Sequence, residues 1–227
     1  MKKNKFENKE KLEDELRDRI VLLIKDSIAK NESTSLLFSG GSTPSGLFKK
    51  LAKVELDWSS VKIGLVDDRM VEEKSEFSNA NMIQDLFISK IKTSKPQFFP
   101  LVFDHENEKN NSKKLNEIID EIGVPDITIL GMGGDGHFAS LFPRNKKSER
   151  GLLLNNRNAF CYTTAPSEPR ERISFTWSFL RKSTNLFLFI TGESKLSLID
   201  SIYKREELPI DTLLIDDEIK PELYWAP

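Results

Sequence analysis

The residues best suited to chemistry in this sequence lie in a glycine-rich loop, Gly131-Met-Gly-Gly-Asp-Gly-His137, which follows the apolar run 126–130. His137 is one of only two histidines in 227 residues, and an imidazole can accept a proton near neutral pH. Asp135, two residues earlier, is placed to orient the ring or to balance its charge. The pattern predicts a general base at His137, with a histidine that only hydrogen-bonds its own loop as the alternative.

The same loop matches the Gly-x-Gly-x-x-Gly fingerprint of dinucleotide-binding proteins, but its surroundings argue against a nucleotide. That fingerprint requires a helix beginning within the glycines and an acidic residue at the end of the next strand. Here Pro143 follows shortly, and the next expected strand, 159–163, has no acid at its end. Asp135 would also put a negative charge among the amides meant for pyrophosphate. We therefore expect no nicotinamide or flavin nucleotide.

A second candidate is the turn Ser39-Gly-Gly-Ser-Thr-Pro44, between an apolar run and a helical pattern. Backbone N–H groups around Gly41, Ser42 and Thr43, at the start of a helix, would favour an anion such as phosphate. The sequence lacks the Gly-Lys-Ser/Thr continuation of a P-loop. A tight turn with Ser42 or Thr43 as helix cap is the alternative, and the pattern alone does not separate the two.

Three further segments bring cations to expected element boundaries: Asp67-Asp68-Arg69 ends a strand, Arg172 begins one, and Lys195 lies just inside a helix. A guanidinium can hold a carboxylate or phosphate with two hydrogen bonds, and the adjacent aspartates add acceptors. Lys195 opposes the helix dipole, which hints at an anion in front of it. Solvated loop charges are the alternative for each cation, and for Asn79 the alternative is support of the loop after Arg69.

These segments need a scaffold, and the apolar patterning predicts one in which strands alternate with helices. Strands are expected at 35–39, 61–66, 126–130, 159–163, 173–176 and 185–191, and helices within the first thirty residues and over 44–51, 79–87, 112–122 and 194–203. This alternation indicates an α/β fold, one domain over 1–227, with a mostly parallel sheet covered on both faces. Ligands in this class bind beyond the carboxyl ends of the strands. The polar segment 143–150 is expected to be a mobile loop.

Composition narrows the function classes. A net charge of −2 gives no broad basic field for nucleic acid. The single cysteine, Cys161, can form no intramolecular disulfide or thiolate cage, and its apolar neighbours suggest a buried strand position. The first sixteen residues lack the apolar core of a secretory signal, and no run is long and apolar enough to span a bilayer. We expect a cytoplasmic protein with no nucleic-acid or membrane partner.

Taken in order, these segments resemble the 6-phosphogluconolactonase family over nearly the whole chain. The shared motifs are Ser-Gly-Gly-Ser-Thr-Pro, Asp-Asp-Arg, Ser-Asn, Leu-Gly-Met-Gly-x-Asp-Gly-His-x-Ala-Ser-Leu-Phe-Pro, Pro-x-x-Arg-Ile-x-x-Thr and Thr-Gly-x-x-Lys. The resemblance implies a three-layer, Rossmann-like α/β/α fold, similar to glucosamine-6-phosphate deaminase and ribose-5-phosphate isomerase. It also implies hydrolysis of 6-phospho-D-glucono-1,5-lactone to 6-phospho-D-gluconate in the oxidative pentose phosphate pathway, without metal or cofactor.

The resemblance assigns roles to particular residues. His137 would activate the attacking water, and Asp135 would orient it. The substrate, a small phosphosugar lactone, would be bound by Gly41, Ser42, Thr43, Asp68, Arg69, Asn79, Arg172 and Lys195. Which of the three cations meets the phosphate stays open, as does the choice between a monomer and a homodimer.

Two features separate the chain from the related glucosamine-6-phosphate deaminases. After His137 it continues Phe-Ala-Ser-Leu-Phe-Pro143 rather than Ile-Ala-Phe-Asn-Glu-Pro, and its second site is Asp-Asp-Arg rather than Asp-Glu-Tyr. It departs from the lactonase pattern at Asp68, where the family usually has the longer glutamate. A non-catalytic sugar-phosphate-binding module of a regulator is the alternative from another functional class, since a fold does not fix a function.

Overall fold

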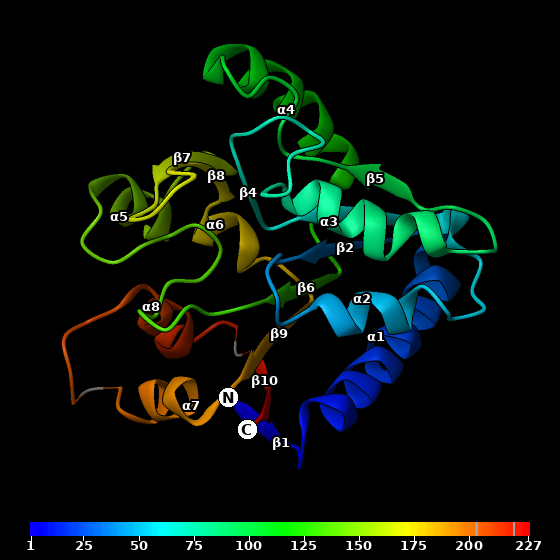
Figure 1. Cartoon of the computed structure of the whole chain (residues 1–227), viewed down its shortest axis with the longest axis horizontal. Helices are drawn as coiled ribbons and strands as arrows, with labels where there is room; N and C mark the ends of the chain where they lie inside the picture. The colour runs from blue at the N-terminus through cyan, green and yellow to red at the C-terminus, as the bar shows by residue number, and fades with distance from the viewer. Residues whose placement is uncertain (203, 220) are drawn as a thin grey trace.

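The computed structural model describes residues 1–202, 204–219 and 221–227, and its centre is a sheet of parallel strands (Figure 1). In spatial order these are β1 (Lys2–Lys5), β10 (Glu222–Ala226), β9 (Asn185–Thr191), β6 (Ile127–Leu130), β2 (Thr34–Phe38), β3 (Val61–Leu65) and β5 (Gln97–Phe99). All neighbouring pairs run parallel. The two central strands, β2 and β6, are buried along their whole length, which is why they read as short apolar runs without alternation.

Helices cover this sheet. They are α1 (Lys9–Asn31), α2 (Ser45–Leu51), α3 (Asn79–Leu86), α4 (Glu108–Ile122), α5 (Lys146–Leu152), α6 (Trp177–Leu180), α7 (Glu193–Asp200) and α8 (Pro209–Ile215), with 3-10 turns η1 (Trp58–Ser60) and η2 (Ile88–Lys90). Because crossovers between parallel strands are right-handed, α1, α2 and α3, which lead toward β5, lie on one face, and α4 and α7, which lead back, lie on the other. Contacts of α2 with both α1 and α3 agree with this, and the three run close together in Figure 1. The expected α/β fold with a mostly parallel sheet is confirmed.

The first helix follows directly from its sequence pattern. Leu12, Leu16, Ile20 and Ile24 recur at helical spacing and are fully buried against the sheet. The Asn8 side chain accepts a hydrogen bond from the Lys11 amide and so caps the helix. The helix expected within the first thirty residues is therefore confirmed.

A second, smaller sheet was not expected. It contains β4 (Asp67–Arg69), β8 (Glu171–Phe175) and β7 (Phe160–Thr164), and both of its pairs are antiparallel. The strands expected at 159–163 and 173–176 do form, but not in the main sheet. A short connection lets two successive strands pair as neighbours, whereas a parallel pair needs a crossover of a dozen or more residues.

Two further expectations differ from the structure, one in the kind of segment and one in where a helix ends. The segment 143–150 is not a mobile loop: the Asn145 side chain accepts hydrogen bonds from the Lys147 and Ser148 amides and so starts α5. The polarity of the segment reflects the solvent-facing side of a short helix. The helix expected over 194–203 is α7, which ends at Asp200, and the last expected residue, Tyr203, lies outside the described residues.

The connections out of β2 and β6 diverge. These strands are neighbours, yet β2 continues toward β3 and β6 continues to the opposite side, toward β9. Loops leaving adjacent strand ends in opposite directions open a crevice at the carboxyl edge of a parallel sheet, where ligands of this fold class bind. The turn after β2 and the glycine-rich loop after β6 both begin at this point. Over the described residues, no helix is both long and apolar enough to cross a bilayer.

Candidate active site

A pocket of about 220 Å³ opens at the diverging ends of β2 and β6. Its walls come mainly from the turn Ser39–Pro44, the strand β4 with the start of α3, the loop after β6, and the start of α7, and the ends of β6 and β9 add apolar side chains. The lining residues include Gly41, Ser42, Thr43, Asp67, Arg69, Asn79, Gly133, His137 and Lys195. The turn after β2 and the loop after β6 are joined directly, because the Ser39 hydroxyl accepts a hydrogen bond from the Gly131 amide at 3.1 Å.

His137 and Asp135 are in contact. The Nδ1 atom of His137 lies 2.5 Å from Oδ1 of Asp135, which also accepts the His137 amide at 3.2 Å. A carboxylate at Nδ1 fixes the proton of the neutral ring there and leaves Nε2 as the free acceptor. Burial raises the pKa of Asp135, but the hydrogen bond and charge of His137 outweigh it and leave that pKa below its usual value. His137 lines the pocket, whereas Asp135 contacts the histidine without being a lining residue itself.

Gly133 is what allows the histidine ring to lie where it does. A Cβ atom at this position would come within 2.2 Å of Cε1 and 2.3 Å of Nδ1 of His137. The Gly133 amide also donates to the His137 carbonyl at 2.9 Å, which closes the loop on itself. The ring therefore packs directly over bare backbone, and any side chain at Gly133 would displace it.

The rest of this loop is tied to the second sheet through buried hydroxyls. The Ser140 hydroxyl donates to a carboxylate oxygen of Asp67 at 2.6 Å, and its carbonyl accepts from Thr163 at 2.7 Å. The Ser140 amide donates to the Ser174 hydroxyl. Asp67 is buried and also lines the pocket. It was absent from the residues expected to bind substrate, and its place beside Asp68 and Arg69 was the available signal.

The turn after β2 presents mainly backbone to the pocket. Gly41 has a φ of 97°, in the left-handed region that favours glycine. Neither the Ser42 nor the Thr43 side chain makes a hydrogen bond to another described residue, and α2 begins without a side-chain cap. The helix-cap alternative for this turn is therefore wrong, and both hydroxyls stay available on the pocket wall.

Asn79 fixes the position of Arg69. Its Oδ1 accepts from Nη1 of Arg69 at 2.5 Å, and its Nδ2 donates to the Asp67 carbonyl at 2.9 Å. The same guanidinium nitrogen donates to the Phe77 carbonyl at 3.0 Å. Asn79 also lies against Gly40, where a Cβ atom would come within 2.0 Å of its Oδ1. One amide side chain thus connects the arginine, the β4 backbone and the turn.

Asp68, expected to bind substrate, does not line the pocket. It is fully buried, and its two carboxylate oxygens accept the amides of Arg69, Asn79 and Ala80 at 2.7 to 3.0 Å. Burial raises the pKa of this carboxyl to about 6, against the opposing effect of these amides. Successive residues of a strand point to opposite sides, so Asp67 faces the pocket and Asp68 anchors the start of α3.

The other two predicted cations occupy different positions. Lys195 lines the pocket, and burial lowers the pKa of its ammonium group. Arg172 is the cross-strand neighbour of Arg69 and is buried outside the lining, with its Nη1 unpartnered within the described residues. Burial, followed by the charge of Arg69, lowers the pKa of Arg172. An anion near this pair would offset the repulsion between the two guanidinium groups, so Arg172 adds to the positive potential around Arg69.

Comparisons with known proteins decide the family. The family model described as glucosamine-6-phosphate isomerases/6-phosphogluconolactonase matches residues 7–225. The chain belongs to this family. Among similar relatives, a 6-phosphogluconolactonase of Rhizobium meliloti is 32% identical over 226 residues, covering 98% of this chain and 97% of the relative. One from Helicobacter pylori strain J99 is 32% identical over 229 residues, covering 97% and 96%.

Solved structures of the family share the fold. A 6-phosphogluconolactonase from Shewanella baltica superposes with a TM-score of 0.93 at 26% identity, covering 100% of this chain and 98% of that one. A monomeric glucosamine-6-phosphate deaminase superposes with a TM-score of 0.79 at 17% identity, covering 100% and 97%. The likeness to the deaminase establishes the common fold, as the sequence motifs implied, and nothing about its reaction.

Proposed function

We propose that this family member hydrolyses 6-phospho-D-glucono-1,5-lactone to 6-phospho-D-gluconate, with His137 activating the attacking water. The observation that carries the proposal is a histidine whose Nδ1 is held by Asp135 and whose ring lines the same pocket as an exposed backbone turn and two cations. Near full-length similarity to named 6-phosphogluconolactonases supports the same reaction. The partner is a small phosphosugar lactone.

In the proposed reaction, Nε2 of His137 accepts a proton from water as the water oxygen attacks the lactone carbonyl carbon. The resulting oxyanion is stabilised by cationic or N–H donors of the pocket. When the tetrahedral intermediate collapses, the bond from this carbon to the ring oxygen breaks, and the protonated histidine returns its proton to that oxygen. Asp135 stabilises the charged imidazole between the two steps. No step is assigned to a metal or an organic cofactor.

For the substrate, we propose that Gly41, Ser42 and Thr43 hold the phosphate through backbone N–H groups and hydroxyls. Arg69 and Lys195, which line the pocket, supply the cations that touch substrate oxygens. Asn79 positions Arg69. Arg172 and Asp68 act through their neighbours and make no contact of their own with the substrate.

The test is lactone hydrolysis with substrate made in the assay by oxidation of glucose 6-phosphate, after subtraction of the spontaneous rate. The wild-type protein should add a catalysed rate that saturates with substrate, and His137→Gln should remove most of it while the protein stays folded. A wild-type rate equal to the spontaneous one would reject the proposal in favour of a binding module. Ammonia release from glucosamine 6-phosphate would reject it in favour of a deaminase.

A further inference from the structure

One charged side chain breaks the pattern of the first helix. Glu13 lies among the apolar residues that α1 buries, and only 6% of its surface is exposed. Burial raises the pKa of its carboxyl, against the opposing charges of Lys9 and Lys50. A buried carboxylate is costly unless it is closely paired, and an apolar side chain would serve the packing of α1 better. Its position therefore calls for a role beyond the stability of the helix.

The carboxylate of Glu13 lies directly against the start of α2. A Cβ atom at Gly46 would come within 2.2 Å of Oε1 of Glu13, so only glycine leaves room for it. Glycine within a helix lowers its stability. The contact between Glu13 and Gly46 therefore combines two locally unfavourable features, a buried carboxyl and a helical glycine. Gly46 is separated from Thr43, in the pocket wall, by two residues. Glu13 thus contacts α2 close to the turn without lining the pocket.

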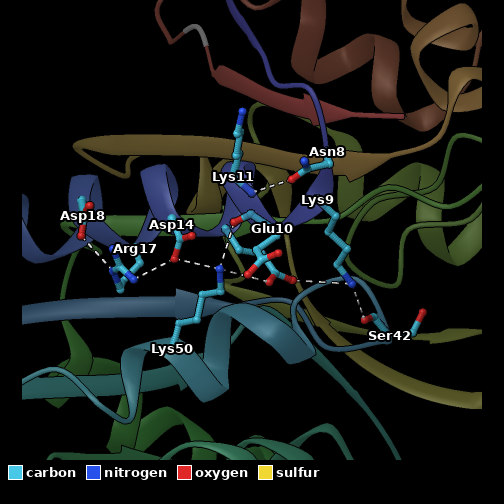
Figure 2. A network of polar contacts seen from close by, with 10 residues as sticks. Asn8, Lys9, Glu10, Lys11, Asp14, Arg17, Asp18, Ser42 and Lys50 are labelled. Atoms are coloured by element: carbon cyan, nitrogen blue, oxygen red, sulfur yellow. Dashed lines mark hydrogen bonds and ion pairs between the residues drawn. The ribbon is translucent and has the colours of Figure 1, made fainter.

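Lys9 links this carboxylate to the turn itself. Its Nζ lies 3.6 Å from Oε1 of Glu13 and donates to the Ser42 carbonyl at 3.4 Å, and Figure 2 shows the side chain reaching from α1 to that residue. The Ser45 hydroxyl donates to the same carbonyl at 2.9 Å. Both donors hold this carbonyl in place, and so fix the orientation of the peptide unit that joins Ser42 to the Thr43 amide.

On the other side of Glu13, Lys50 fixes the distance between the two helices. Its Nζ lies 3.9 Å from Glu13, contacts Asp14 at 2.7 Å and donates to the Glu10 carbonyl at 2.9 Å. In Figure 2 this lysine projects from α2 toward α1. Lys50 is paired with Asp14 and with the Glu10 carbonyl. Of the two lysines beside Glu13, Lys9 is therefore the one that contacts the turn.

We propose that Lys9 and Glu13 are positioning residues that hold the Gly41–Thr43 turn in its phosphate-binding conformation. This inference rests on the proposed function. It predicts that the pair controls affinity for the phosphate group and leaves the chemistry at His137 unchanged. Neither side chain lines the pocket, so neither contacts the substrate.

The experiment compares Lys9→Met and Glu13→Gln with the wild type. The KM for the phosphorylated lactone should rise about fivefold with kcat within twofold, as expected when binding rather than transition-state stabilisation is lost. The inhibition constant of inorganic phosphate should rise by the same factor. The kcat/KM for unphosphorylated D-glucono-1,5-lactone should not change, and Lys9→Arg, which keeps a donor, should restore the wild-type KM.

Lys11→Met is the matched control, because Lys11 is a solvent-facing lysine of the same helix that pairs with Glu7. It should leave both constants unchanged. The proposal is overturned if folded Lys9→Met keeps the wild-type KM and phosphate inhibition, or if both lactones lose activity equally. Should Glu13→Gln not fold, Lys9→Met decides alone.

Failure of the proposed function would be recognised separately. If the wild type hydrolyses neither lactone, calorimetric titration with inorganic phosphate on the same variants replaces the kinetic readout. Weaker phosphate binding by Lys9→Met would then support the positioning role without lactonase activity. Absence of phosphate binding to the wild type would overturn the positioning role as well.

Discussion

The two loops that meet at the carboxyl edge of the sheet are built on opposite principles. The turn 39–44 offers the pocket mainly backbone and short hydroxyls, and it is supported from outside by side chains of α1 and α3. The loop 131–143 offers an imidazole, and it is fixed by its own glycines and by buried hydroxyls that tie it to the small sheet. Ser39 and Gly131 join the two.

This difference separates binding from chemistry. A backbone turn can surround a phosphate without titrating, whereas proton transfer needs one ring held in one orientation. Changes near the turn should therefore act mainly on KM, and changes near the histidine mainly on kcat. Four predictions follow the difference from the largest expected effect to the smallest: three test the division between KM and kcat, and one tests the stability of a buried carboxyl beside the turn.

Removing the imidazole should give the largest effect. His137→Ala should lower kcat by about 10² to 10⁴, the usual contribution of a positioned general base, while the inhibition constant of inorganic phosphate stays within twofold. Steady-state kinetics with corrected spontaneous hydrolysis measures both. If phosphate affinity fell by the same factor as kcat, binding and chemistry would not be separated between the two loops.

The buried carboxyl of Asp68 holds the start of α3, which carries Asn79 beside the turn, and the titration of this carboxyl affects the free energy of unfolding. The pKa of Asp68 is raised from 3.8 to about 6 in the folded protein, so the folded state binds this proton more tightly than the unfolded state. The resulting stability is fully present below pH 3.8 and is lost as the pH rises through 6, an amount of about 3 kcal/mol.

Urea unfolding of the wild type and Asp68→Asn from pH 4 to 8 measures this term, because other groups titrate alike in both proteins. The wild-type free energy of unfolding should fall relative to that of the variant across this range. Parallel curves would show that the amide donors of Arg69, Asn79 and Ala80 hold Asp68 ionised throughout.

Adding one methyl group at Gly133, in the loop that carries His137, should lower kcat. In Gly133→Ala the new Cβ would overlap the His137 ring, and a displaced catalytic group should lower kcat by about 10- to 100-fold. Gly134→Ala is the matched control, since no atom lies within 4 Å of a Cβ there. Similar kinetics for the two variants would refute the packing argument.

The turn should respond to the same change through affinity. In Gly40→Ala the new Cβ would meet the Asn79 amide, which must move and release Arg69. Loss of one hydrogen bond to a charged group predicts a KM about tenfold higher with little change in kcat. Gly131→Ala, with 3.8 Å of clearance, serves as control. A fall in kcat at unchanged KM would contradict the division between the loops.

Most strands and helices of the main sheet could be predicted from the sequence, because their apolar residues recur with a recognisable period. The strand 185–191 and the helix that begins at Asn79 are examples. The roles of adjacent residues could not be separated in the same way. Asp67 and Asp68 have the same side chain and are adjacent in sequence, and only the alternation of side chains along the folded strand decides which one faces the pocket.

Contacts between segments far apart in the chain could not be predicted from the sequence either. Lys9 and Glu13 belong to an ordinary charged helix pattern, and their relation to Ser42 depends on how α1 packs against α2. The small antiparallel sheet was missed for a similar reason, since β4 is three residues long and pairs with a strand about one hundred residues away. Short strands carry too few residues for a period to be read.

The outermost strand of the main sheet, β1, has β10 as its only neighbour among the described residues, and Figure 1 shows the N and C labels close together there. Lys2–Lys5 therefore cannot pair until residues 222–226 have left the ribosome, although the core strands β2, β3 and β6 can meet much earlier. The segment Lys2–Lys5 must therefore wait for a partner strand that is made much later than itself. Closure of this edge thus requires both β1 and β10, which lie more than two hundred residues apart in the sequence.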